Sequence, residues 1–383
     1  MGRVDVAGAD LRPVVVLGAT GSIGIQALEV ADRIGMPVVG LAAGHLSPEF
    51  RALAERYPDA ILAVADGETD PSSDLTLGVG AEAVALLATL EDAVVVNGIV
   101  GAAGLEPTLA ALAAGNRVAL ANKESLVTGG PLVLDALQTE GAELLPVDSE
   151  HSAVWQCLAG EDPATVKRVV LTASGGPFRG MKAEELAGVS VEEALAHPTW
   201  DMGDRITIDS ATLMNKALEV IEAHFLFGLD FDQIDVVVHP QSFVHALVEY
   251  VDGVVKAEVG PPDMRKPIQV ALTHPGRAPG AATAFDFTEL TFEEPDRRAF
   301  PALDLGYEAG RRGGNAPAVL NAADEVAVSA FLEGRIPFPA IAHVVESSLE
   351  AVPHQTLHRL EDALEADREG RNAAAEAIAV RSG

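Results

Sequence analysis

The chain has one cysteine, Cys157, among its 383 residues. A single thiol excludes an intrachain disulfide and a cysteine-rich zinc site, so we expect a cytoplasmic protein in a reducing compartment. Long hydrophobic runs are also missing, because the longest uncharged apolar stretch, residues 93–105, is too short to span a bilayer. The opening residues carry Asp5 and Asp10 and lack a long apolar core, so we expect no signal peptide.

Positive charge is scarce. The chain has 26 Lys and Arg against 57 Asp and Glu, which gives a formal net charge of −31. A protein that binds a polyanion must place basic groups against its phosphates, so this balance argues against nucleic acid and against an anionic membrane as partners. A strongly acidic surface favours solubility and says little about fold.

Aromatic residues make up only 4% of the chain, although hydrophobic residues make up 48%. The core must therefore consist mostly of Ala, Val and Leu, which suits α/β layers and helices. At roughly 150 residues per domain the length predicts two to three domains. Such a chain can bury large cores without disulfides.

Three regions differ in pattern. From residue 13 to about 148, short β-branched runs alternate with helical segments, which predicts βαβ units and a parallel sheet. Residues 149–273 contain the strands of a second sheet, with a hairpin at 251–253. Residues 274–301 are rich in Pro, Gly and charge and indicate a linker, and the remainder of the chain is helical.

The first motif, Gly18-Ala19-Thr20-Gly21-Ser22-Ile23-Gly24, directly follows a predicted strand and opens a predicted helix. Glycines at such a turn let the backbone approach a pyrophosphate that lies against the helix N-terminus. The alternative is a glycine-rich turn that serves only helix packing. The position after the first strand favours nucleotide binding.

The end of the second strand indicates which nucleotide is bound. An NAD site usually has an acidic residue there, which holds the ribose 2′-hydroxyl. This strand ends in Gly44 and His45 without an acid, and Arg51 follows on the next helix. NADP is therefore favoured, with Gly44 and His45 as cofactor-binding candidates, although His45 is equally consistent with a plain loop histidine.

Two further motifs follow predicted strands of the parallel sheet. Lys123, in Ala121-Asn122-Lys123-Glu124-Ser125, is suited to hold a substrate oxygen, whereas the alternative is a surface Lys–Glu pair. Asp148 and Glu150 are two residues apart and point the same way in extended backbone. Two such carboxylates repel each other unless a cation lies between them, and oxygen ligands favour Mg²⁺ or Mn²⁺ over zinc. Helix capping by Asp148 or Ser149 is the alternative, and it is compatible with metal binding.

Three segments of the second region also carry candidate residues. Ser174 follows a strand and precedes two glycines, which suits a phosphate nest or an ordinary turn. Residues 197–203 mix Pro, Gly, Trp200 and Met and indicate a loop that closes over a site, with a structural turn as the alternative. Asn215 and Glu219 are four residues apart and share a helix face, so Glu219 could reach a metal, whereas the plain interpretation is a Lys216–Glu219 helix pair.

Together these segments resemble the 1-deoxy-D-xylulose 5-phosphate reductoisomerase family, from about residue 14 to about residue 352. Several separated motifs in the right order are far more specific than any one of them. The resemblance implies an NADPH-dependent oxidoreductase. Such an enzyme isomerises 1-deoxy-D-xylulose 5-phosphate and reduces the product to 2-C-methyl-D-erythritol 4-phosphate in non-mevalonate isoprenoid biosynthesis.

The resemblance also implies roles for individual residues. The cofactor-binding residues would be Thr20, Gly21, Ser22, Ile23, Asn122, Glu124 and Gly203. The metal ligands would be Asp148, Glu150 and Glu219, which with Lys123 form the catalytic group. Lys123 and Ser149 would contact the substrate carbon backbone, beside Glu150 and Glu219. The phosphate end of the substrate would be held by Ser174, His197, Ser210, Asn215 and Lys216, with Trp200 in a lid above it.

The implied fold class is α/β, with four parts. These are a Rossmann-like NADPH-binding domain (1–148), an α+β catalytic and dimerisation domain (149–273) with a lid at about 197–205, a linker (274–301) and a C-terminal helical bundle (302–383). The implied partners are a phosphosugar substrate and a second copy of the chain in a homodimer. The family often has Lys-Asn or Gly-Gly after Gly44 where this chain has His45 and Leu46, and Arg205 replaces a common lysine.

Two other functions fit the same motifs. One is another NAD(P)-dependent sugar-phosphate or semialdehyde oxidoreductase, which would not need Asp148, Glu150 and Glu219 to act together. The other is a protein that binds NADPH without turnover. Neither explains why a set of carboxylates accompanies the serines expected to hold phosphate.

Overall fold

The structure is a computed structural model that describes residues 8, 11–67, 77–200, 202–280 and 289–382. Asp5 and Asp10, residue 201 of the predicted lid, and residues 281–288 of the predicted linker lie outside the described residues. The chain divides into two compact units. The first unit consists of residues 1–125, 132–152 and 263–283, and the second unit of residues 126–131, 153–262 and 284–383. The four-part division proposed from the sequence stays a prediction.

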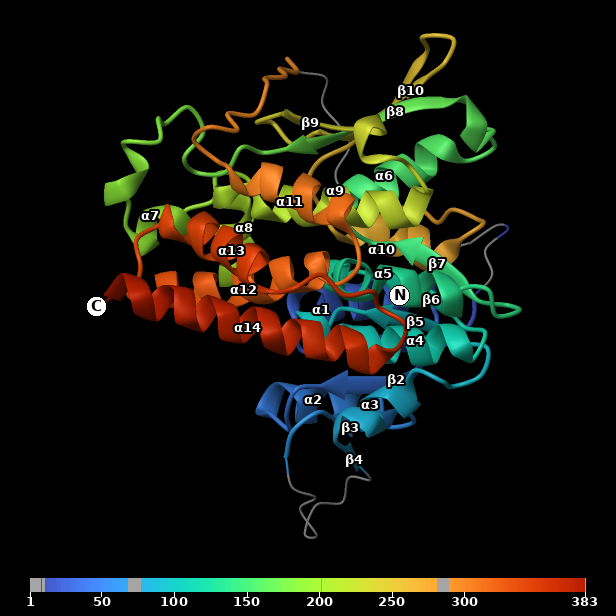
Figure 1. The fold of residues 1–383 in the computed structure, drawn as a ribbon. Helices are drawn as coiled ribbons and strands as arrows, with labels where there is room; N and C mark the ends of the chain where they lie inside the picture. The colour runs from blue at the N-terminus through green and yellow to red at the C-terminus, as the bar shows by residue number, and fades with distance from the viewer. Residues whose placement is uncertain (1–7, 9–10, 68–76, 201, 281–288, 383) are drawn as a thin grey trace. The chain divides into compact units, whose positions relative to one another are not determined.

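The first unit is built on a seven-stranded sheet in which every pairing is parallel (Figure 1). Its strands are β1 (Val14–Leu17), β2 (Val38–Ala43), β3 (Ile61–Val64), β4 (Leu77–Val79), β5 (Val94–Asn97), β6 (Arg117–Leu120) and β7 (Glu143–Pro146). The strand order is β4-β3-β2-β1-β5-β6-β7, so the direction of winding reverses between β1 and β5. Ligands of such sheets bind outside the carboxyl ends of the strands at this switch point. The predicted parallel sheet is confirmed, whereas β3 and β4 were not predicted.

The helices of the first unit follow from the strand–helix alternation of its sequence. They are α1 (Ser22–Ile34), α2 (Pro48–Arg56), α3 (Ala81–Leu87), the 3-10 turn Ala102–Gly104, α4 (Leu105–Ala113), the ends of α5 (Lys123–Ala136), the start of α6 (Ser149–Leu158) and α10 (Arg265–Thr273). All four residues of β1 are fully buried, as expected for a strand with helices on both faces of its sheet. The helix α10, distant in sequence, packs against α1.

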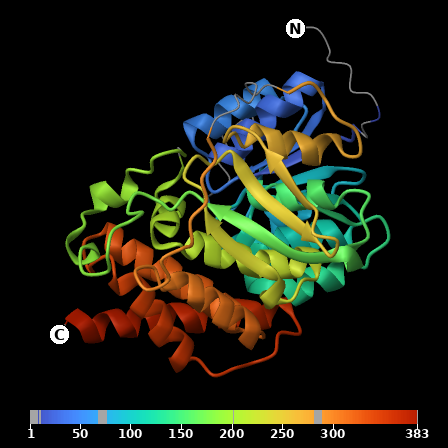
Figure 2. The same cartoon turned by 90° about the horizontal axis from the view of Figure 1, so that it is seen from above.

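The second unit contains a mixed four-stranded sheet, drawn in green to yellow in Figure 2. Its strands are β8 (Val166–Ala173), β9 (Ile234–Val238), β10 (Val244–Tyr250) and β11 (Val255–Val259), in the order β11-β10-β8-β9. β10 and β11 form the antiparallel hairpin that residues 251–253 predicted, whereas β8 and β9 are parallel. One face of β9 is buried through Ile234, Val236 and Val238.

The remaining helices belong to the second unit. They are α7 (Val191–Leu195), α8 (Asp204–Thr212), α9 (Met214–Phe227), α11 (Ala302–Arg312), α12 (Ala316–Leu332), α13 (Ala340–Ala351) and α14 (Leu360–Ser382). α12, α13 and α14 lie side by side as a helical layer (Figure 1). The sequence predicts one helix over residues 211–227, but α8 and α9 are separate because Leu213 has a left-handed backbone with φ 63°. Gly306 of α11 allows close packing on α9, since a Cβ there would lie 2.5 Å from the Cβ of Ala217.

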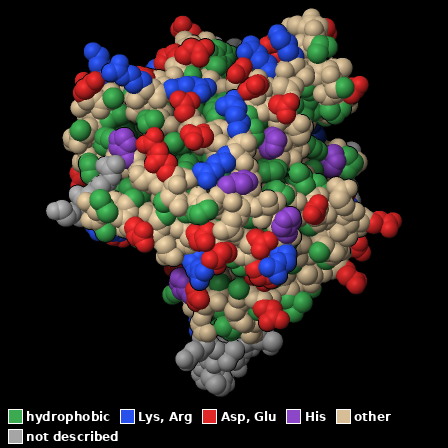
Figure 3. Space-filling view, viewed as in Figure 1, with side chains coloured by type: hydrophobic (Ala, Val, Ile, Leu, Met, Phe, Trp, Pro, Cys, Tyr) green, Lys and Arg blue, Asp and Glu red, His purple; other side chains and the backbone are tan. Residues whose placement is uncertain are grey.

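Side chains of both signs are interspersed on the face drawn in Figure 3. The acidic excess of the chain is thus accompanied on this face by many Lys and Arg side chains. Among the described residues, no helix has the length and apolar character needed to cross a membrane.

Candidate functional site

The glycine motif forms the turn between β1 and α1 in the first unit. Gly18 has φ +77°, and a Cβ on it would lie 2.6 Å from the carbonyl oxygen of Gly98. A Cβ on Gly24 would lie 2.3 Å from the carbonyl oxygen of Gly18. α1 begins after Gly21 without a side-chain cap and without an acidic residue in its first turn. Its N-terminal amides and dipole therefore suit a pyrophosphate, and the group fits these donors because no carboxylate opposes it in the first turn.

The end of β2 contains the residues predicted near the adenosine ribose. Gly44 and His45 follow β2 and are exposed, and Ser47 caps α2 by accepting a hydrogen bond of 3.2 Å from the amide of Phe50. Arg51 of α2 is also exposed. No acidic side chain occupies the last residues of β2 or the positions 44–47. The negative charge of a 2′-phosphate would meet no carboxylate from these positions.

Asn122 and Glu124 shape the loop that follows β5. The Asn122 side-chain amide donates to the carbonyl oxygens of Ile99 (2.8 Å) and Gly101 (2.9 Å). Glu124 accepts a hydrogen bond of 3.0 Å from the amide of Gly101. Asn122 also caps α5, because its Oδ1 accepts from the amide of Ser125 at 2.9 Å. The sequence motif predicted cofactor contacts for both residues but did not reveal this loop as their structural partner.

The carboxyl ends of β6 and β7 bring together Lys123, Asp148, Ser149 and Glu150 in the first unit. The Nζ of Lys123 lies 2.6 Å from Oδ2 of Asp148, and these side chains are 9% and 12% exposed. The Ser149 hydroxyl donates to Oε2 of Glu150 at 2.6 Å. Buried His151 lies 3.8 Å from Asp148, measured from Nδ1 to Oδ2. The interpretation of Lys123 as a surface pair is wrong, because both members of its ion pair are almost buried.

In the second unit, the first turns of α9 hold a buried carboxylate. Glu219 is fully buried, and its Oε1 accepts a hydrogen bond of 2.6 Å from the Asn215 side-chain amide. The Lys216 ammonium group forms an ion pair with Oε2 of Glu219. The helical spacing therefore brings these three side chains together as the sequence predicted. Burial of a charge without such partners would be very unfavourable.

Ser174, His197 and Ser210 meet at one place in the second unit. His197 Nδ1 accepts hydrogen bonds from the amides of Thr199 (3.1 Å) and Trp200 (2.9 Å). The ring proton of a neutral imidazole therefore lies on Nε2, which is 2.9 Å from the Ser174 hydroxyl. Burial lowers the pKa of His197 and so favours this neutral form. The Ser210 hydroxyl lies 3.5 Å from the Ser174 hydroxyl.

The predicted lid connects this group to α8. The Trp200 ring lies beside the His245 ring in a tilted arrangement, with 6.2 Å between the ring centroids. Gly203 is exposed and precedes the first residue of α8, where its carbonyl oxygen accepts from the Thr207 amide at 3.1 Å. The lid is therefore attached at both of its described ends, through His197 and through α8.

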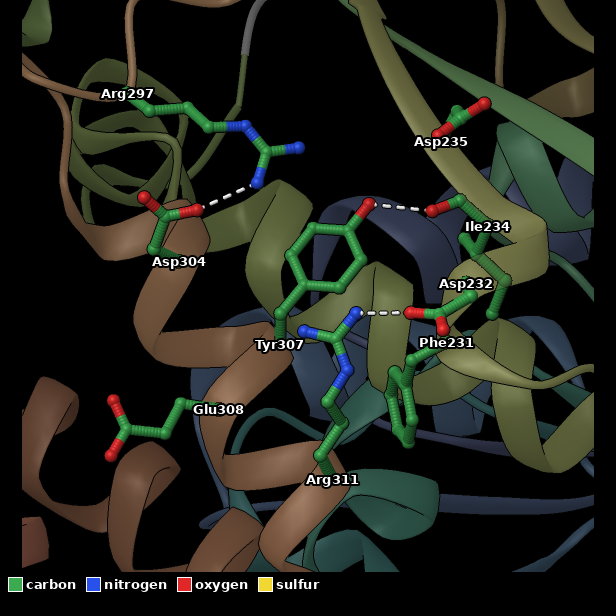
Figure 4. A pocket seen from close by; sticks show the side chains of 9 residues that line it. All are labelled: Phe231, Asp232, Ile234, Asp235, Arg297, Asp304, Tyr307, Glu308 and Arg311. Carbon is green, nitrogen blue, oxygen red and sulfur yellow. Dashed lines mark hydrogen bonds and ion pairs between the residues drawn. The ribbon is translucent and has the colours of Figure 1, made fainter.

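A pocket of about 570 Å³ on the second unit contains none of the predicted site residues (Figure 4). It is lined by Phe231, Asp232, Ile234, Asp235, Arg297, Asp304, Tyr307, Glu308 and Arg311. The Tyr307 ring lies between the guanidinium groups of Arg297 (5.1 Å) and Arg311 (5.4 Å). Its hydroxyl donates to the carbonyl oxygen of Ile234 at 2.7 Å, and each guanidinium has a carboxylate partner. These contacts tie α11 to β9 and the preceding turn, so we interpret the pocket as structural.

Family models match most of the chain. A model described as 1-deoxy-D-xylulose 5-phosphate reductoisomerase matches residues 14–130. The model of the 1-deoxy-D-xylulose 5-phosphate reductoisomerase C-terminal domain matches residues 144–227, and the DXP reductoisomerase C-terminal domain matches residues 259–373. The matches cover all the predicted site residues.

Proteins of the same name are similar over the full length. The 1-deoxy-D-xylulose 5-phosphate reductoisomerase of Pelotomaculum thermopropionicum is 50% identical over 379 residues, covering 94% of this chain and 97% of that protein. The enzyme of Chlorobium chlorochromatii is 49% identical over 377 residues, covering 95% of this chain and 99% of that protein.

Solved structures of reductoisomerases are similar to this chain over almost its whole length. The Zymomonas mobilis 1-deoxy-D-xylulose 5-phosphate reductoisomerase in complex with NADPH has a TM-score of 0.89 at 42% identity, covering 96% of this chain and 99% of that chain. A DOX-P reductoisomerase in complex with NADPH, fosmidomycin and magnesium has a TM-score of 0.90 at 38% identity, covering 97% of this chain and 99% of that chain. NADPH and magnesium, the cofactors predicted from the sequence, are thus present in related structures.

These matches confirm the recognition made from the sequence motifs, together with the α/β fold class and the enzyme class that it implied. Identity near 50% over almost the whole length and high structural similarity give the same assignment. The chain belongs to the 1-deoxy-D-xylulose 5-phosphate reductoisomerase family.

Proposed function

We propose that this chain converts 1-deoxy-D-xylulose 5-phosphate to 2-C-methyl-D-erythritol 4-phosphate by isomerisation and NADPH-dependent reduction, with a divalent cation. The observation that carries the proposal is the buried Lys123–Asp148 pair at the carboxyl edge of the parallel sheet, with Glu150 two residues further along the chain. Hydride transfer alone does not require carboxylates at this edge. A cation that polarises a substrate carbonyl does require them.

We propose that NADPH binds along the carboxyl ends of β1, β2 and β5. Thr20, Gly21, Ser22 and Ile23 would hold the pyrophosphate through the open N-terminus of α1. Gly44 and His45 would be next to the adenosine ribose, and Asn122 and Glu124 would support the loop on the nicotinamide side. Gly203 of the lid is the remaining cofactor-binding candidate.

The proposed metal ligands are Asp148, Glu150 and Glu219. All three offer carboxylate oxygens, which are the donors that Mg²⁺ and Mn²⁺ prefer. When bound, the cation would act as a Lewis acid on the substrate carbonyl and stabilise the oxyanion that develops on it. Lys123 and Lys216 balance the charge of two of these carboxylates within nearly dry surroundings, and Ser149 orients Glu150.

Hydroxyl and imidazole groups of the second unit are suited to the phosphate end of the substrate. Ser174 Oγ accepts from His197 Nε2–H and from the amide of Gly176 at 3.2 Å. Its own hydroxyl proton is therefore available for an acceptor such as a phosphate oxygen. Ser210, Asn215 and Lys216 would complete the phosphate-binding site. The binding energy of the phosphate would orient the reacting carbons.

The segment at 197–205 would cover the bound substrate. Trp200 provides a large apolar side chain, and His197 fixes the start of the lid through its two accepted amide hydrogen bonds. Closure over the substrate would exclude water from the site.

We also propose that two copies of the chain form a homodimer through the open face of the four-stranded sheet. A groove on this face is lined by Arg168, Val170, Asp235, Val236, Val237, Leu247, Glu249, Val255, Phe292, Glu294 and Arg297. Val255 is 51% exposed and Phe292 is 45% exposed, and the face also carries the ion pairs of Arg168 with Asp235 and Glu249. An apolar patch bordered by charged groups is typical of an interaction surface, and a twofold axis pairs such a patch with itself.

The test of the proposed reaction is NADPH oxidation in the presence of 1-deoxy-D-xylulose 5-phosphate. We expect turnover with Mg²⁺ or Mn²⁺, little turnover with excess chelator, and weaker use of NADH. Equal use of NADH would leave the reaction in place and contradict the cofactor preference. Turnover that persists with chelator, or none despite NADPH binding, would contradict the proposal and favour another oxidoreductase or a sensor.

A further inference from the structure

Arg205 lies in the first turn of α8, at the end of the predicted lid. Its side chain is 19% exposed, and its guanidinium is directed to the helical layer of the second unit. Nη1 donates to Oε1 of Glu325 at 2.9 Å, and Nη2 donates to Oδ1 of Asn321 at 2.8 Å. Both acceptors belong to α12. One side chain therefore joins α8 to α12 through two directed hydrogen bonds.

The α12 acceptors are themselves held in position. The Asn321 side-chain amide donates to Oε1 of Glu325 at 3.2 Å. Oε2 of Glu325 accepts a hydrogen bond from Arg371 of α14. Arg371 also donates to Asp367 at 2.7 Å. Asn321, Glu325, Arg371 and Asp367 are therefore linked by side-chain hydrogen bonds, which restrict one another's movement. The long C-terminal helices thus provide a fixed support for Arg205.

A pair of buried carboxyl groups lies beside this junction. Asp209 of α8 is 4% exposed and Asp324 of α12 is fully buried. Arg205 is close to both, with Nε 3.6 Å from Asp209 and Nη2 3.8 Å from Asp324. The two carboxyl groups are close enough for the charge of one to act on the other. Burial, and then the charge of Asp209, raise the pKa of Asp324, while Arg205 opposes the rise.

The helix that Arg205 anchors also carries a proposed phosphate ligand. Ser210 directly follows Asp209, and its hydroxyl lies 3.5 Å from that of Ser174. The backbone of α8 next to Ser210 packs tightly on Gly176, because a Cβ on Gly176 would lie 2.9 Å from the Cα of Ala211. A displacement of α8 would therefore change the spacing of the two serines directly.

We propose that Arg205 is a positioning residue, which joins α8 to α12 and thereby fixes Ser210 and the end of the lid for binding the substrate phosphate. The inference rests on the proposed function and gives the C-terminal helices a role in it. Removal of the guanidinium would leave the Asp209–Asp324 pair without its cation and α8 without its two directed hydrogen bonds. Phosphate affinity would fall, whereas the first-unit groups that bind the cofactor and Lys123 would be unaffected.

The test compares Arg205→Met and Arg205→Lys with Arg371→Met. Arg371→Met is the matched control, because it removes a guanidinium from the same network at a position that does not touch α8. We expect Arg205→Met to raise KM for 1-deoxy-D-xylulose 5-phosphate about 10- to 100-fold, with kcat and KM for NADPH changed less than about 3-fold. Arg205→Lys keeps the positive charge, so its affinity for the substrate should lie between those of Arg205→Met and the wild type. Arg371→Met should lower Tm and leave KM within about 2-fold.

Hydrogen exchange supplies a readout that does not depend on activity. Backbone amides of residues 205–212 should exchange faster in Arg205→Met than in wild type or Arg371→Met. Unchanged KM in Arg205→Met, or equal changes in kcat and in KM for both substrates, would overturn the positioning role. If wild type failed to turn over the substrate, the proposed function would fall, and with it the phosphate role. Unchanged exchange would instead overturn the anchoring of α8 alone.

Discussion

Buried carboxylates in both units are paired with specific partners. Asp148 is paired with Lys123, and Glu219 with Lys216 and Asn215. Breaking a buried pair by removing one partner leaves an uncompensated charge and costs about 3–5 kcal/mol. We therefore expect substitutions at these positions to affect stability as well as chemistry, and each experiment needs a measurement for both.

The first residue-scale prediction concerns Glu219. Glu219→Gln keeps the shape of the side chain and its contact with Asn215 but removes a carboxylate from the proposed metal ligands. We expect kcat to fall by about 1000-fold or more, since loss of metal charge stabilisation costs several kcal/mol. NADPH affinity, followed by cofactor fluorescence, should remain within about 2-fold. The surface variant Glu308→Gln serves as the control, and near-normal turnover in Glu219→Gln would exclude Glu219 as a ligand.

The second residue-scale prediction concerns the carboxyl pair. Burial raises the pKa of Asp324 above its ordinary value of 3.8, so the folded state retains a proton that the unfolded chain releases. The contribution of Asp324 to the free energy of unfolding is therefore fully present below pH 3.8 and is lost as the pH rises toward the folded-state pKa. Asp324→Asn keeps the size and shape of the side chain and does not titrate.

Relative to the wild type, we expect Asp324→Asn to gain stability as the pH rises above 3.8. The gain is about 1.4 kcal/mol for every pH unit between 3.8 and the folded-state pKa. Denaturant unfolding at several pH values measures it. A stability difference that does not vary with pH would show that Asp324 is not the protonated group.

At the scale of the element, functional side chains lie where strands end and helices begin. Asn122 caps α5, Gly203 precedes α8, and the glycine turn leads into α1. The ends of helices leave amide groups without helical partners, and these groups suit phosphates and carboxylates. Periodicity locates such junctions approximately. It did not reveal the break at Leu213, because a left-handed leucine is a conformation that only its buried surroundings stabilise.

The element-scale prediction concerns the turn between β1 and α1. Gly24→Ala would place a methyl group 2.3 Å from the carbonyl oxygen of Gly18, so α1 must move away from the turn. We expect a loss of about 1–3 kcal/mol in stability and at least about 10-fold weaker NADPH binding. Gly188→Ala is the matched control, since no atom lies within 4 Å of a Cβ there. Equal behaviour of the two variants in calorimetry and cofactor titration would contradict the tight turn.

At the scale of the whole molecule, self-association depends on which groups the surface of the chain exposes. The open sheet face of the second unit has half-buried Val170, Val237 and Leu247 among paired charges. Removing these apolar side chains from water would favour association by about 25 cal/mol per Å² of buried apolar surface.

The whole-molecule prediction is that Leu247→Asp weakens the proposed homodimer. A carboxylate at the centre of the face would be desolvated on association, so we expect the mass measured by light scattering to shift from dimer toward monomer at micromolar concentration. Leu86→Asp, at a 67% exposed position on α3, is the control and should keep the wild-type mass. A Leu247→Asp protein that remained dimeric would place the interface elsewhere.

Much of this protein follows from local sequence. Alternating apolar runs predict the parallel sheet, since β1 and β5 are buried on both faces, and glycine spacing predicts the first turn. Helical spacing predicts that Asn215 and Glu219 meet, because residues four apart share a helix face. The motifs, read in order, also indicated the family that the comparisons confirmed.

Only the tertiary structure decided which distant groups lie within reach of one another. The partners of Arg205 are 116 and 120 positions away along the chain, and Asp324 meets Asp209 across two helices. No periodicity relates such positions, because their proximity depends on how α8 and α12 pack. The same holds for Lys123, for which the sequence suggested a surface Lys–Glu pair and which in the fold forms a nearly buried ion pair with Asp148. Burial sets the strength of each of these interactions, and burial is a property of the packed chain.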